Sequence, residues 1–283
     1  APAAATEGHF EPDGGALRFD VGSAQRPGKP WVNLLANPGL GTQVSETGAG
    51  NTWALNSRLN QLTAWSNDPV ADPPAEWFLL QDRRSGQAWS LAPSAWGDSQ
   101  VLYQVEHGQG FTRISHRQGP LEVELRWCVD ARTAVKQVSV RLVNHGIRKV
   151  HLRLTGLVEW MLGEKRGDRA TLHTQPCYTD PASTELLGLL CTQIDATSGF
   201  GGGTAFFGEV HAGTHAAHGH PEADSPWLSD GLDWTCDRRA FFNPLGQLVL
   251  PERLGQRSGY GLDPCAAISR LITLRPGTGR EQV

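Results

Sequence analysis

The sequence predicts an all-β protein built as an antiparallel sandwich or barrel, and three observations lead to that class. Apolar and polar residues alternate with a period of two in several runs, as they do along strands with one buried face. The chain holds 33 glycines and 18 prolines among 283 residues, a share that is typical of folds with many turns. The sequence contains no convincing amphipathic helix longer than a few turns, which argues against a helical bundle.

The predicted strands follow one another at short intervals. Before residue 120, glycines recur at roughly ten-residue spacing, as expected between the strands of a sandwich or barrel; these are Gly86, Gly97, Gly108, Gly110 and Gly119. Residues 121–129, 138–142 and 150–154 then alternate with a period of two, and each run predicts a strand. Residues 184–194 are a short apolar run with a glycine in the middle, which favours a buried strand over a helix.

Turn-forming residues separate these runs. A turn follows the first run at 130–132, and Asn144-His145-Gly146 predicts a short antiparallel connection between 138–142 and 150–154. Residues 198–203 predict a flexible turn, and residues 211–226 predict a loop. We expect one β-sandwich domain over residues 28–283, preceded by an N-terminal extension and first strand over residues 1–27.

The composition excludes several classes of protein. Charged residues make up 19% of the chain and the formal net charge is −4, so we expect neither a nucleic-acid-binding protein nor a disordered one. The five cysteines include no C-x-x-C pair, which indicates reduced thiols and a cytoplasmic setting. No run of 18 apolar residues predicts a membrane span. The chain begins Ala-Pro and has a single methionine, Met161, so we expect a domain excised from a longer protein.

The densest group of polar residues, 43–76, has the composition of a sugar-binding site. It combines carboxylates, amides, one arginine and two tryptophans. Amides and carboxylates form hydrogen bonds with sugar hydroxyls, and indole rings cover the apolar faces of pyranoses. The same residue types also form turns, so an alternative interpretation is a set of ordinary loops.

Other candidate chemistry has less support. His211, His215, His218 and His220 are spaced like metal ligands, but their Gly/Ala/Pro-rich segment offers little rigidity, so we expect a solvated loop and no metal site. His107 follows a predicted strand beside two glycines, where ordering a turn is the favoured role and acid–base catalysis the alternative. The sequence has no G-x-S-x-G, P-loop or G-x-G-x-x-G motif, and we expect no cofactor.

Two tryptophans and one charged triplet need separate interpretations. Trp127 lies on the apolar face of its predicted strand, and we expect it in the core together with Trp160. Asp237-Arg238-Arg239 is consistent with either a buried ion pair or a surface turn, and the sequence does not separate the two.

Several motifs occur in a recognisable order. They include Gln-Val-Ser-Glu-Thr-Gly-Ala-Gly at 43–50, Val-Glu-Trp-Met-Leu-Gly at 158–163 and Gly-Leu-Asp-Pro-Cys-Ala at 261–266. Shorter matches stand at 30–33, 52–53, 56–58, 62–63, 65–70, 103–108, 110–111 and 237–238. In this order the motifs resemble the amino-terminal β-sandwich of glycoside hydrolase family 94, formerly glycosyltransferase family 36. The likeness is greatest to the module of cyclic β-1,2-glucan synthases and related sugar phosphorylases.

The resemblance implies a two-sheet antiparallel supersandwich, similar in fold to galactose mutarotase, that binds carbohydrate and takes part in homodimer contacts. It implies a non-catalytic carbohydrate-binding and dimerisation module of a bacterial β-glucan-processing enzyme, with β-glucan or gluco-oligosaccharide as ligand. Catalysis would belong to a separate α/α-barrel domain of the same parent chain, which this sequence lacks. In a glucan synthase the parent would be tethered to the inner membrane.

The resemblance also marks the segment in which we expect sugar contacts. The candidate residues are Trp53, Asn56, Arg58, Trp65, Asn67 and Asp68. The chain departs from the family pattern at 40–42, where relatives often carry Phe-Gly-Phe, and at 241–244, where an arginine is lost. The histidine-rich segment resembles an insertion.

Two alternative functions stay open. A self-sufficient sugar epimerase of the mutarotase type would need a histidine acid and a carboxylate base in one cleft, and His107 with Glu46 or Glu159 is the pairing that the sequence offers. A purely structural domain would instead pack on the catalytic barrel and leave an apolar patch exposed when that barrel is absent.

Overall fold

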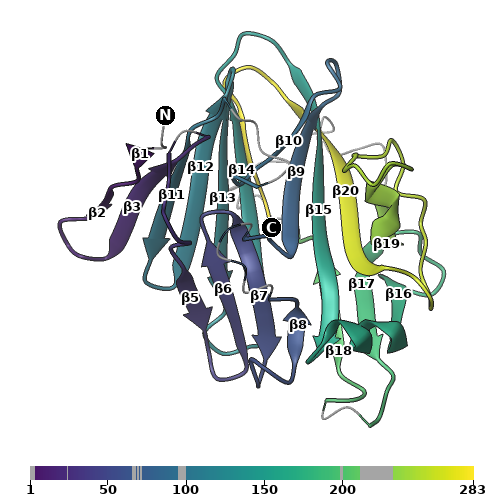
Figure 1. The fold of residues 1–283 in the computed structure, drawn as a ribbon. Coiled ribbons are helices and arrows are strands. Elements are labelled where there is room, and N and C mark those ends of the chain that lie inside the picture. Colours follow the sequence, from purple (N-terminus) through teal and green to yellow (C-terminus); the bar gives the residue numbers. More distant parts are fainter. Residues whose placement is uncertain are drawn as a thin grey trace, which may run out of the picture.

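The computed structural model describes residues 4–23, 25–65, 68, 70, 72–94, 100–197, 200–210 and 232–283. These residues form strands and two short 3-10 helices, η1 (Arg166–Thr171) and η2 (Arg238–Phe241) (Figure 1). The predicted all-β class is confirmed. Strand pairing is antiparallel except between β1 (Ala4–Ala5) and β4 (Gln25–Arg26), among the strands described. Neither helix of this part of the chain has the length and apolar character needed to cross a membrane.

A nine-stranded sheet forms one layer of the molecule. Seven strands run in the order β10-β9-β15-β8-β7-β6-β5, and β20 pairs with both β15 and β19. Their bounds are β5 (Asn33–Ala36), β6 (Leu40–Ser45), β7 (Gly48–Ala54), β8 (Gln61–Thr63), β9 (Glu76–Asp82), β10 (Ala88–Ser90), β15 (Val150–Gly163), β19 (Asp233–Asp237) and β20 (Pro264–Leu274). The long strand β15 is central, because it pairs with β20, β9 and β8.

Besides the two-stranded pairing of β1 with β4, the fold has two further sheets, called the two smaller sheets below. The seven-stranded sheet has the order β2-β3-β11-β12-β13-β14-β21. Its bounds are β2 (Gly8–Phe10), β3 (Ala16–Val21), β11 (Tyr103–Gly108), β12 (Phe111–Gln118), β13 (Leu121–Val129), β14 (Lys136–Asn144) and β21 (Gly279–Gln282). The three-stranded sheet consists of β16 (Leu172–Tyr178), β17 (Leu186–Gln193) and β18 (Thr204–Gly208).

Both smaller sheets pack on the same face of the nine-stranded sheet. Leu154 of β15 belongs to the core shared with the seven-stranded sheet, and Trp160 of β15 belongs to the core shared with the three-stranded sheet. Successive side chains of a strand point to opposite faces, so Leu154 and Trp160, six positions apart, point to the same face. Strand β15 therefore packs against both smaller sheets. On its other face, Leu157 packs with Phe241 of η2.

The strands predicted from period two are confirmed. Residues 121–129 are β13, 138–142 lie in β14, 150–154 begin β15, and the apolar run 184–194 contains β17. Trp127 and Trp160 are both buried, as predicted. In β13 the apolar residues face the nine-stranded sheet, so the hydrophobic effect selects this register.

The connection at 144–146 is not the predicted antiparallel link. β14 pairs with β13 and β21, whereas β15 pairs within the other sheet, so this segment crosses between the two layers. The buried Asn144 holds the crossing, because its Nδ2 donates to the Arg148 carbonyl at 2.8 Å and to the Leu274 carbonyl at 3.2 Å. Asn144 Oδ1 accepts from the Gly146 backbone N–H. A five-residue link of this composition can form either a hairpin or a crossing between sheets. The hydrogen bond from Asn144 to the distant Leu274 carbonyl is one of the contacts that select the crossing.

The segment before residue 28 contributes to the sandwich. β3 pairs with β11 along its full length, and β2 pairs with β3. Phe19 of β3 is buried in the main core. The strand expected in this segment is therefore an integral part of the seven-stranded sheet.

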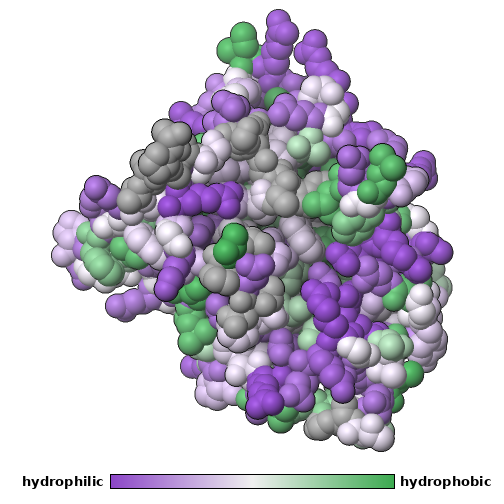
Figure 2. Space-filling view, in the orientation of Figure 1, coloured by the Kyte–Doolittle hydropathy of each residue, from purple (hydrophilic) through white to green (hydrophobic). Residues whose placement is uncertain are grey.

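The surface in the orientation of Figure 1 is mixed. Figure 2 shows its hydrophobic residues in separate groups among hydrophilic ones on this face. Exposed apolar side chains occur on several elements, among them Phe10 of β2, Leu34 of β5 and Phe206 of β18. Single exposed apolar residues are common on soluble proteins and mark no interface by themselves.

Candidate functional site

The predicted sugar-binding residues do not form one cluster. Trp53 lies on β7 with its ring over Gly41 of β6, where an added Cβ would come within 2.2 Å of the ring atom Cζ2. Asn56 lies in the turn after β7, and its Oδ1 accepts backbone N–H groups of Arg58 and Leu59 at 3.0 and 2.8 Å. The two residues therefore have structural contacts of their own: one covers a neighbouring strand, and the other shapes its turn.

Arg58 and Trp65 come together through Gln61 of β8. The Gln61 Oε1 accepts from the Trp65 backbone N–H at 3.3 Å, and its Nε2 donates to the Arg58 carbonyl at 3.2 Å. Arg58 Nε lies 3.3 Å from Glu164 Oε1. Trp65 is 52% exposed, and the Arg58 side chain is exposed as well. We call these four residues the Arg58–Trp65 surface; it presents an open indole and a guanidinium to solvent.

The remaining predicted contacts lie further along. Asp68 is exposed, and its Oδ1 accepts the Val70 backbone N–H at 2.9 Å. Asn67 lies outside the described residues, as do the four histidines at 211, 215, 218 and 220. Among the residues that the structure describes, no group of three or more His, Cys, Asp or Glu side chains is arranged to hold a metal ion.

His107 and Glu46 both hold the backbone of one residue, Trp31. Glu46 Oε2 accepts the Trp31 N–H at 3.0 Å, and His107 Nε2 lies 2.8 Å from the Trp31 carbonyl. His107 Nδ1 is 3.1 Å from Thr112 Oγ1. Burial raises the pKa of Glu46 and lowers the pKa of His107, because it disfavours the charged form of each. Both side chains are spent on ordering this segment, the role favoured for His107 from sequence.

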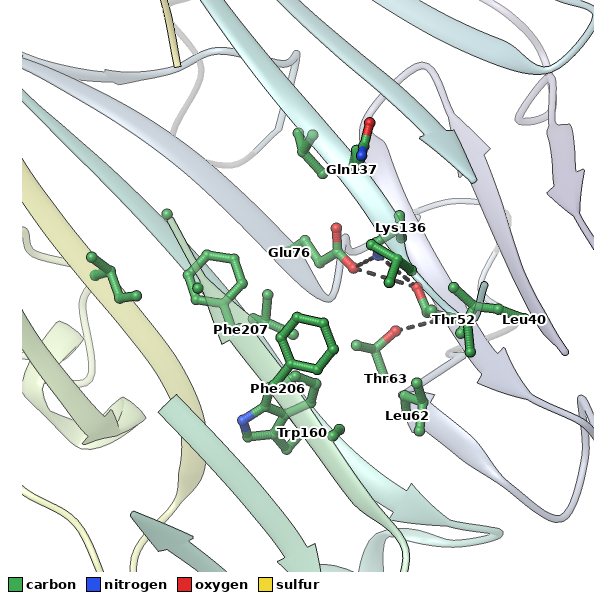
Figure 3. Close-up of a pocket in the computed structure, with 18 of the residues that line it drawn as sticks. Leu40, Thr52, Leu62, Thr63, Glu76, Lys136, Gln137, Trp160, Phe206 and Phe207 are labelled. Carbon is green, nitrogen blue, oxygen red and sulfur yellow. Dashed lines mark hydrogen bonds and ion pairs between the residues drawn. The ribbon is translucent and has the colours of Figure 1, made fainter. Parts of the chain in front are cut away.

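A cavity lies between the two smaller sheets. It has a volume of about 610 Å³ and a floor formed by strands β7, β8, β9 and β15 of the nine-stranded sheet (Figure 3). Strand β14 of the seven-stranded sheet and strand β18 of the three-stranded sheet form its walls. Thr52 and Ala54 of β7 line it, whereas Trp53 between them does not, because adjacent residues of a strand point to opposite faces.

One end of this cavity is polar. Lys136 of β14 forms an ion pair with Glu76 of β9, and its Nζ donates to Thr52 Oγ1 at 2.8 Å (Figure 3). The Glu76 side chain is 1% exposed and that of Lys136 is 13% exposed. Within the described structure Glu76 Oε2 accepts no hydrogen bond. The carboxylate therefore has an unused acceptor beside the cavity, which costs free energy when buried.

Aromatic rings and a second ion pair form the other walls. Trp160 of β15 and Phe206 and Phe207 of β18 line the cavity (Figure 3). Arg270 of β20 and Glu209 also line it, and Arg270 Nε lies 2.7 Å from Glu209 Oε1. Sequence reasoning missed this site, apart from the motifs that contain Thr52, Trp160 and the β8 residues, because its residues come from strands far apart in the chain.

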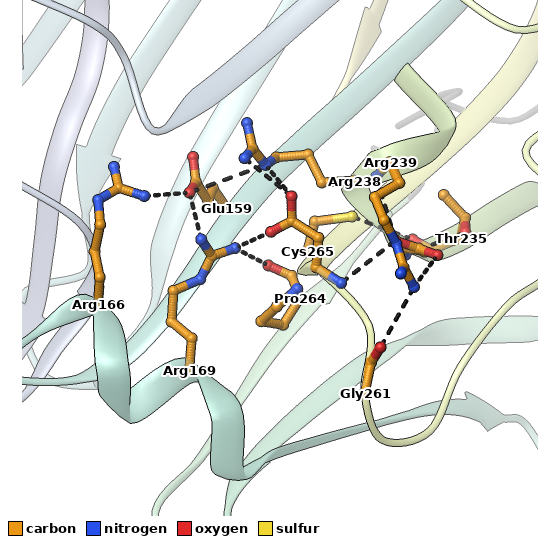
Figure 4. A network of polar contacts seen from close by, with 11 residues as sticks. Glu159, Arg166, Arg169, Thr235, Arg238, Arg239, Gly261, Pro264 and Cys265 are labelled. Carbon is orange, nitrogen blue, oxygen red and sulfur yellow. Dashed lines mark hydrogen bonds and ion pairs between the residues drawn. The ribbon is translucent and has the colours of Figure 1, made fainter. Parts of the chain in front are cut away.

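The motif segments 158–163, 237–238 and 261–266 meet in an ion network (Figure 4). Glu159 Oε1 lies 2.9 Å from Arg169 Nη1 and 3.3 Å from Arg166 Nη1. Asp263 accepts from Arg238 Nη2 at 2.9 Å and pairs with Arg169 as well. The network joins η1, η2 and the start of β20, so Glu159, the alternative catalytic base, is committed to arginine partners.

Asp237 completes this network from a fully buried position. Its carboxylate accepts from Arg239 Nε at 2.8 Å and from Arg257 Nη1 at 3.1 Å. Burial alone would raise the pKa of Asp237, but hydrogen bonds from Arg239 and the Asp263 backbone outweigh it and lower that pKa. The sequence allowed either a buried ion pair or a surface turn for residues 237–239, and the structure combines the two. Asp237 is buried in an ion pair, and the exposed Arg239 lies in the turn of η2.

Sequence comparison defines the class of this protein. Residues 18–283 match the family described as glycosyl hydrolase 94, supersandwich domain, and the chain belongs to this family. Two relatives of this chain are named as enzymes. The chain is 27% identical over 282 residues to the cyclic β-(1,2)-glucan synthase NdvB of Rhizobium meliloti strain 1021, covering 97% of this chain. It is 24% identical over 252 residues to the 3-O-β-D-glucopyranosyl-β-D-glucuronide phosphorylase of Paenibacillus borealis, covering 87% of this chain.

The chain spans 9% of the length of the synthase and 29% of the length of the phosphorylase. Among solved structures, it is similar to a putative aldose 1-epimerase from Escherichia coli K12 and a galactose mutarotase-like protein from Lactobacillus casei. The identities are 12% and 9%, and both TM-scores are 0.41. Each comparison covers 89% of this chain and 97% of the other.

Proposed function

We propose that this chain is the non-catalytic supersandwich domain of a larger β-glucan-processing enzyme, and that it binds a β-glucan chain. The observation that carries the proposal is the family match over residues 18–283. Both relatives act on or make β-linked glucosides according to their names, and both are several times longer than this chain. Catalysis would then belong to another part of the parent protein, namely the α/α-barrel domain that the resemblance implies.

The engagement of the candidate acid–base residues supports a non-catalytic role. His107 and Glu46 are bonded to the Trp31 backbone, and Glu159 is paired with arginines. A general acid and base must instead reach the substrate within hydrogen-bonding distance. None of the three lines the cavity, so the self-sufficient epimerase has less support than a binding domain.

The Arg58–Trp65 surface is our proposed outer contact for the glucan. An exposed indole can stack on the C–H face of a glucosyl ring, and the Arg58 guanidinium can donate to its hydroxyls. The Gln61 side chain is bonded to the backbone of both residues, at the Trp65 N–H and the Arg58 carbonyl. The surface is open, which suits an extended or cyclic glucan better than a free monosaccharide.

Calorimetric titration with β-1,2-linked gluco-oligosaccharides tests the proposal. We expect measurable binding by the wild type, and affinity about five- to tenfold weaker in Trp65→Ala and in Arg58→Ala. Leu59→Ala is the matched control, because Leu59 lies on the same turn and is partly exposed. Absence of binding to any glucan by the folded wild type would refute the binding role. Precipitation of both site variants would show that these residues are structural.

A further inference from the structure

The cavity between the two smaller sheets is bounded by two free strand edges. Strand β14 pairs with β21 through residues 140–143, and its residues 136–139 have no partner on that side among the strands described. Strand β18 pairs with β17 alone, so its other edge is free as well. Residues of both edges line the cavity, with Lys136 on one wall and Phe206 on the other (Figure 3).

The backbone of the β14 edge is directed toward the cavity. Asn144 of β14 donates its backbone N–H to the Thr278 carbonyl, on the β21 side, at 2.9 Å. The backbone groups of an antiparallel strand point to alternate sides, so Val138, six residues earlier, presents its N–H and C=O to that same side. Free edges of this kind are templates for pairing with a further strand. The cavity therefore offers main-chain partners to an extended polypeptide.

The floor of the cavity suits apolar side chains. Phe78 of β9 and Leu154 and Val158 of β15 are among the residues that form it. The charged side chains of the lining form two ion pairs, one between β14 and β9 and one between β20 and the segment after β18, so they leave no net charge for an ionic ligand. A strand laid between the two edges would turn every second side chain toward this floor. We expect those inward side chains to be apolar.

Strand β21 leads into this cavity. It pairs Gln282 with Val140, so in the same register the unpaired residues 136–139 lie directly ahead of it. On the other side of the gap, the Val210 N–H donates to the Val283 carbonyl at 2.7 Å. Val283 itself lines the cavity. A strand that continued β21 would therefore run between the β14 and β18 edges without a change of direction.

We propose that in the parent enzyme this cavity is filled by an extended segment that continues β21 beyond Val283 and adds a strand between β14 and β18. The proposal rests on the function above, under which this chain is one domain of a longer protein. The added strand would join the two smaller sheets into one layer over the nine-stranded sheet. It would also pair the free edge at Val138 and cover Phe206, which is 58% exposed. Its expected sequence alternates apolar and polar residues.

Amide hydrogen exchange of the intact parent, compared with that of residues 1–283, tests the proposal. Mass spectrometry with fragmentation to single residues gives the exchange rate of the Val138 N–H in both proteins. We expect that rate to be about tenfold slower in the parent, because the N–H gains a hydrogen bond there. Gln137 is the internal control, since alternation directs its N–H to β13 in both proteins.

Variants of the parent locate the effect. Replacement of the first four residues after Val283 by Gly and Ser should restore fast exchange of Val138, because it removes the apolar side chains and the strand propensity. Replacement of the next four residues is the matched control and should leave the exchange slow. Phe206→Ala should speed the exchange of Val138 in the parent only. Its control is Leu187→Ala, because Leu187 is similarly exposed but does not line the cavity.

The outcomes separate the added strand from other occupants and from glucan binding. Equal exchange of Val138 in the parent and in residues 1–283 would overturn the proposal. Slow exchange that survives the Gly/Ser replacement would overturn it too, by placing another part of the parent in the cavity. Slow exchange in residues 1–283 that becomes fast on dilution would do the same, by placing a second copy there. Slow exchange in the parent with no heat in the glucan titration would support the added strand and refute only the binding role.

Discussion

Replacement of Asp237 by asparagine tests whether the ion network in Figure 4 stabilises the fold. The Asp237 carboxylate is fully buried and accepts from Arg239 Nε at 2.8 Å, Arg239 Nη2 at 2.9 Å and Arg257 Nη1 at 3.1 Å. A hydrogen bond to a charged group contributes about 1.5–3 kcal/mol, but both arginines are more than half exposed, which weakens their attraction through solvent. Asparagine keeps one acceptor oxygen and places an NH₂ group against guanidinium donors. We therefore expect a loss of about 2–3 kcal/mol in the free energy of unfolding.

Urea denaturation followed by tryptophan fluorescence measures this loss. With an m-value of about 3 kcal/mol/M for a chain of this size, the midpoint of Asp237→Asn should fall by about 0.7–1 M. The matched control is Glu252→Gln, because Glu252 also accepts two bonds from one arginine, Arg83, but is exposed to solvent. We expect that control to leave the midpoint nearly unchanged.

The dependence on pH gives the same test a sign. The folded-state pKa of Asp237 is lowered, so the unfolded state binds more protons on the acid side. The stabilisation is fully present above the unfolded pKa of about 3.9 and is lost as pH falls through the lower folded value. The difference in the free energy of unfolding between the wild type and Asp237→Asn should therefore become smaller at acid pH. A variant no less stable than Glu252→Gln at pH 7 would refute the argument from burial.

Two further perturbations follow from buried contacts. Gly41→Val should lower the free energy of unfolding by about 1–3 kcal/mol, and the melting temperature by several degrees, because the new Cβ would meet the Trp53 ring. Gly50→Ala is the control and should leave the melting temperature unchanged, because an added Cβ there meets nothing within 4 Å. Burial lowers the pKa of His116 to about 4, and its Nε2 lies 3.2 Å from Trp89 Nε1. Since the pKa of an unfolded histidine is about 6.5, the free energy of unfolding should fall as the pH drops from 6.5 toward 4. The urea midpoint should therefore change less between pH 7 and pH 5 in His116→Gln than in the wild type. Equal changes in the two proteins would contradict this.

Local pattern was enough to locate the strands whose faces differ in polarity. In β13 the buried Val123, Leu125 and Trp127 alternate with more exposed partners, and one residue of slippage would expose all of them. The sequence prediction over 121–129 therefore coincides with the observed strand. The same pattern does not encode the partner of a strand, so it predicts a hairpin at 144–146, where the structure shows a crossing between sheets.

The site was less accessible to sequence reasoning. Composition and motif order pointed to the segment that contains Arg58 and Trp65, and the structure holds these two at one surface through Gln61. Trp53 and Asn56 carry the same chemical groups, but their contacts are internal. Whether a tryptophan or an amide faces solvent depends on what packs against it, and residue type does not reveal that.

The sequence by itself determined the all-β class, four of the strands between residues 121 and 194 and, through motifs in order, the family. These properties depend on alternation along one strand and on short local motifs, which the chain carries wherever it folds. Tertiary structure alone decided the crossing at Asn144, the commitment of His107 and Glu46 to Trp31, and the cavity with its Lys136–Glu76 pair. The two members of that pair are 60 residues apart and meet because separate sheets pack on one face, driven by burial of apolar surface summed over many strands.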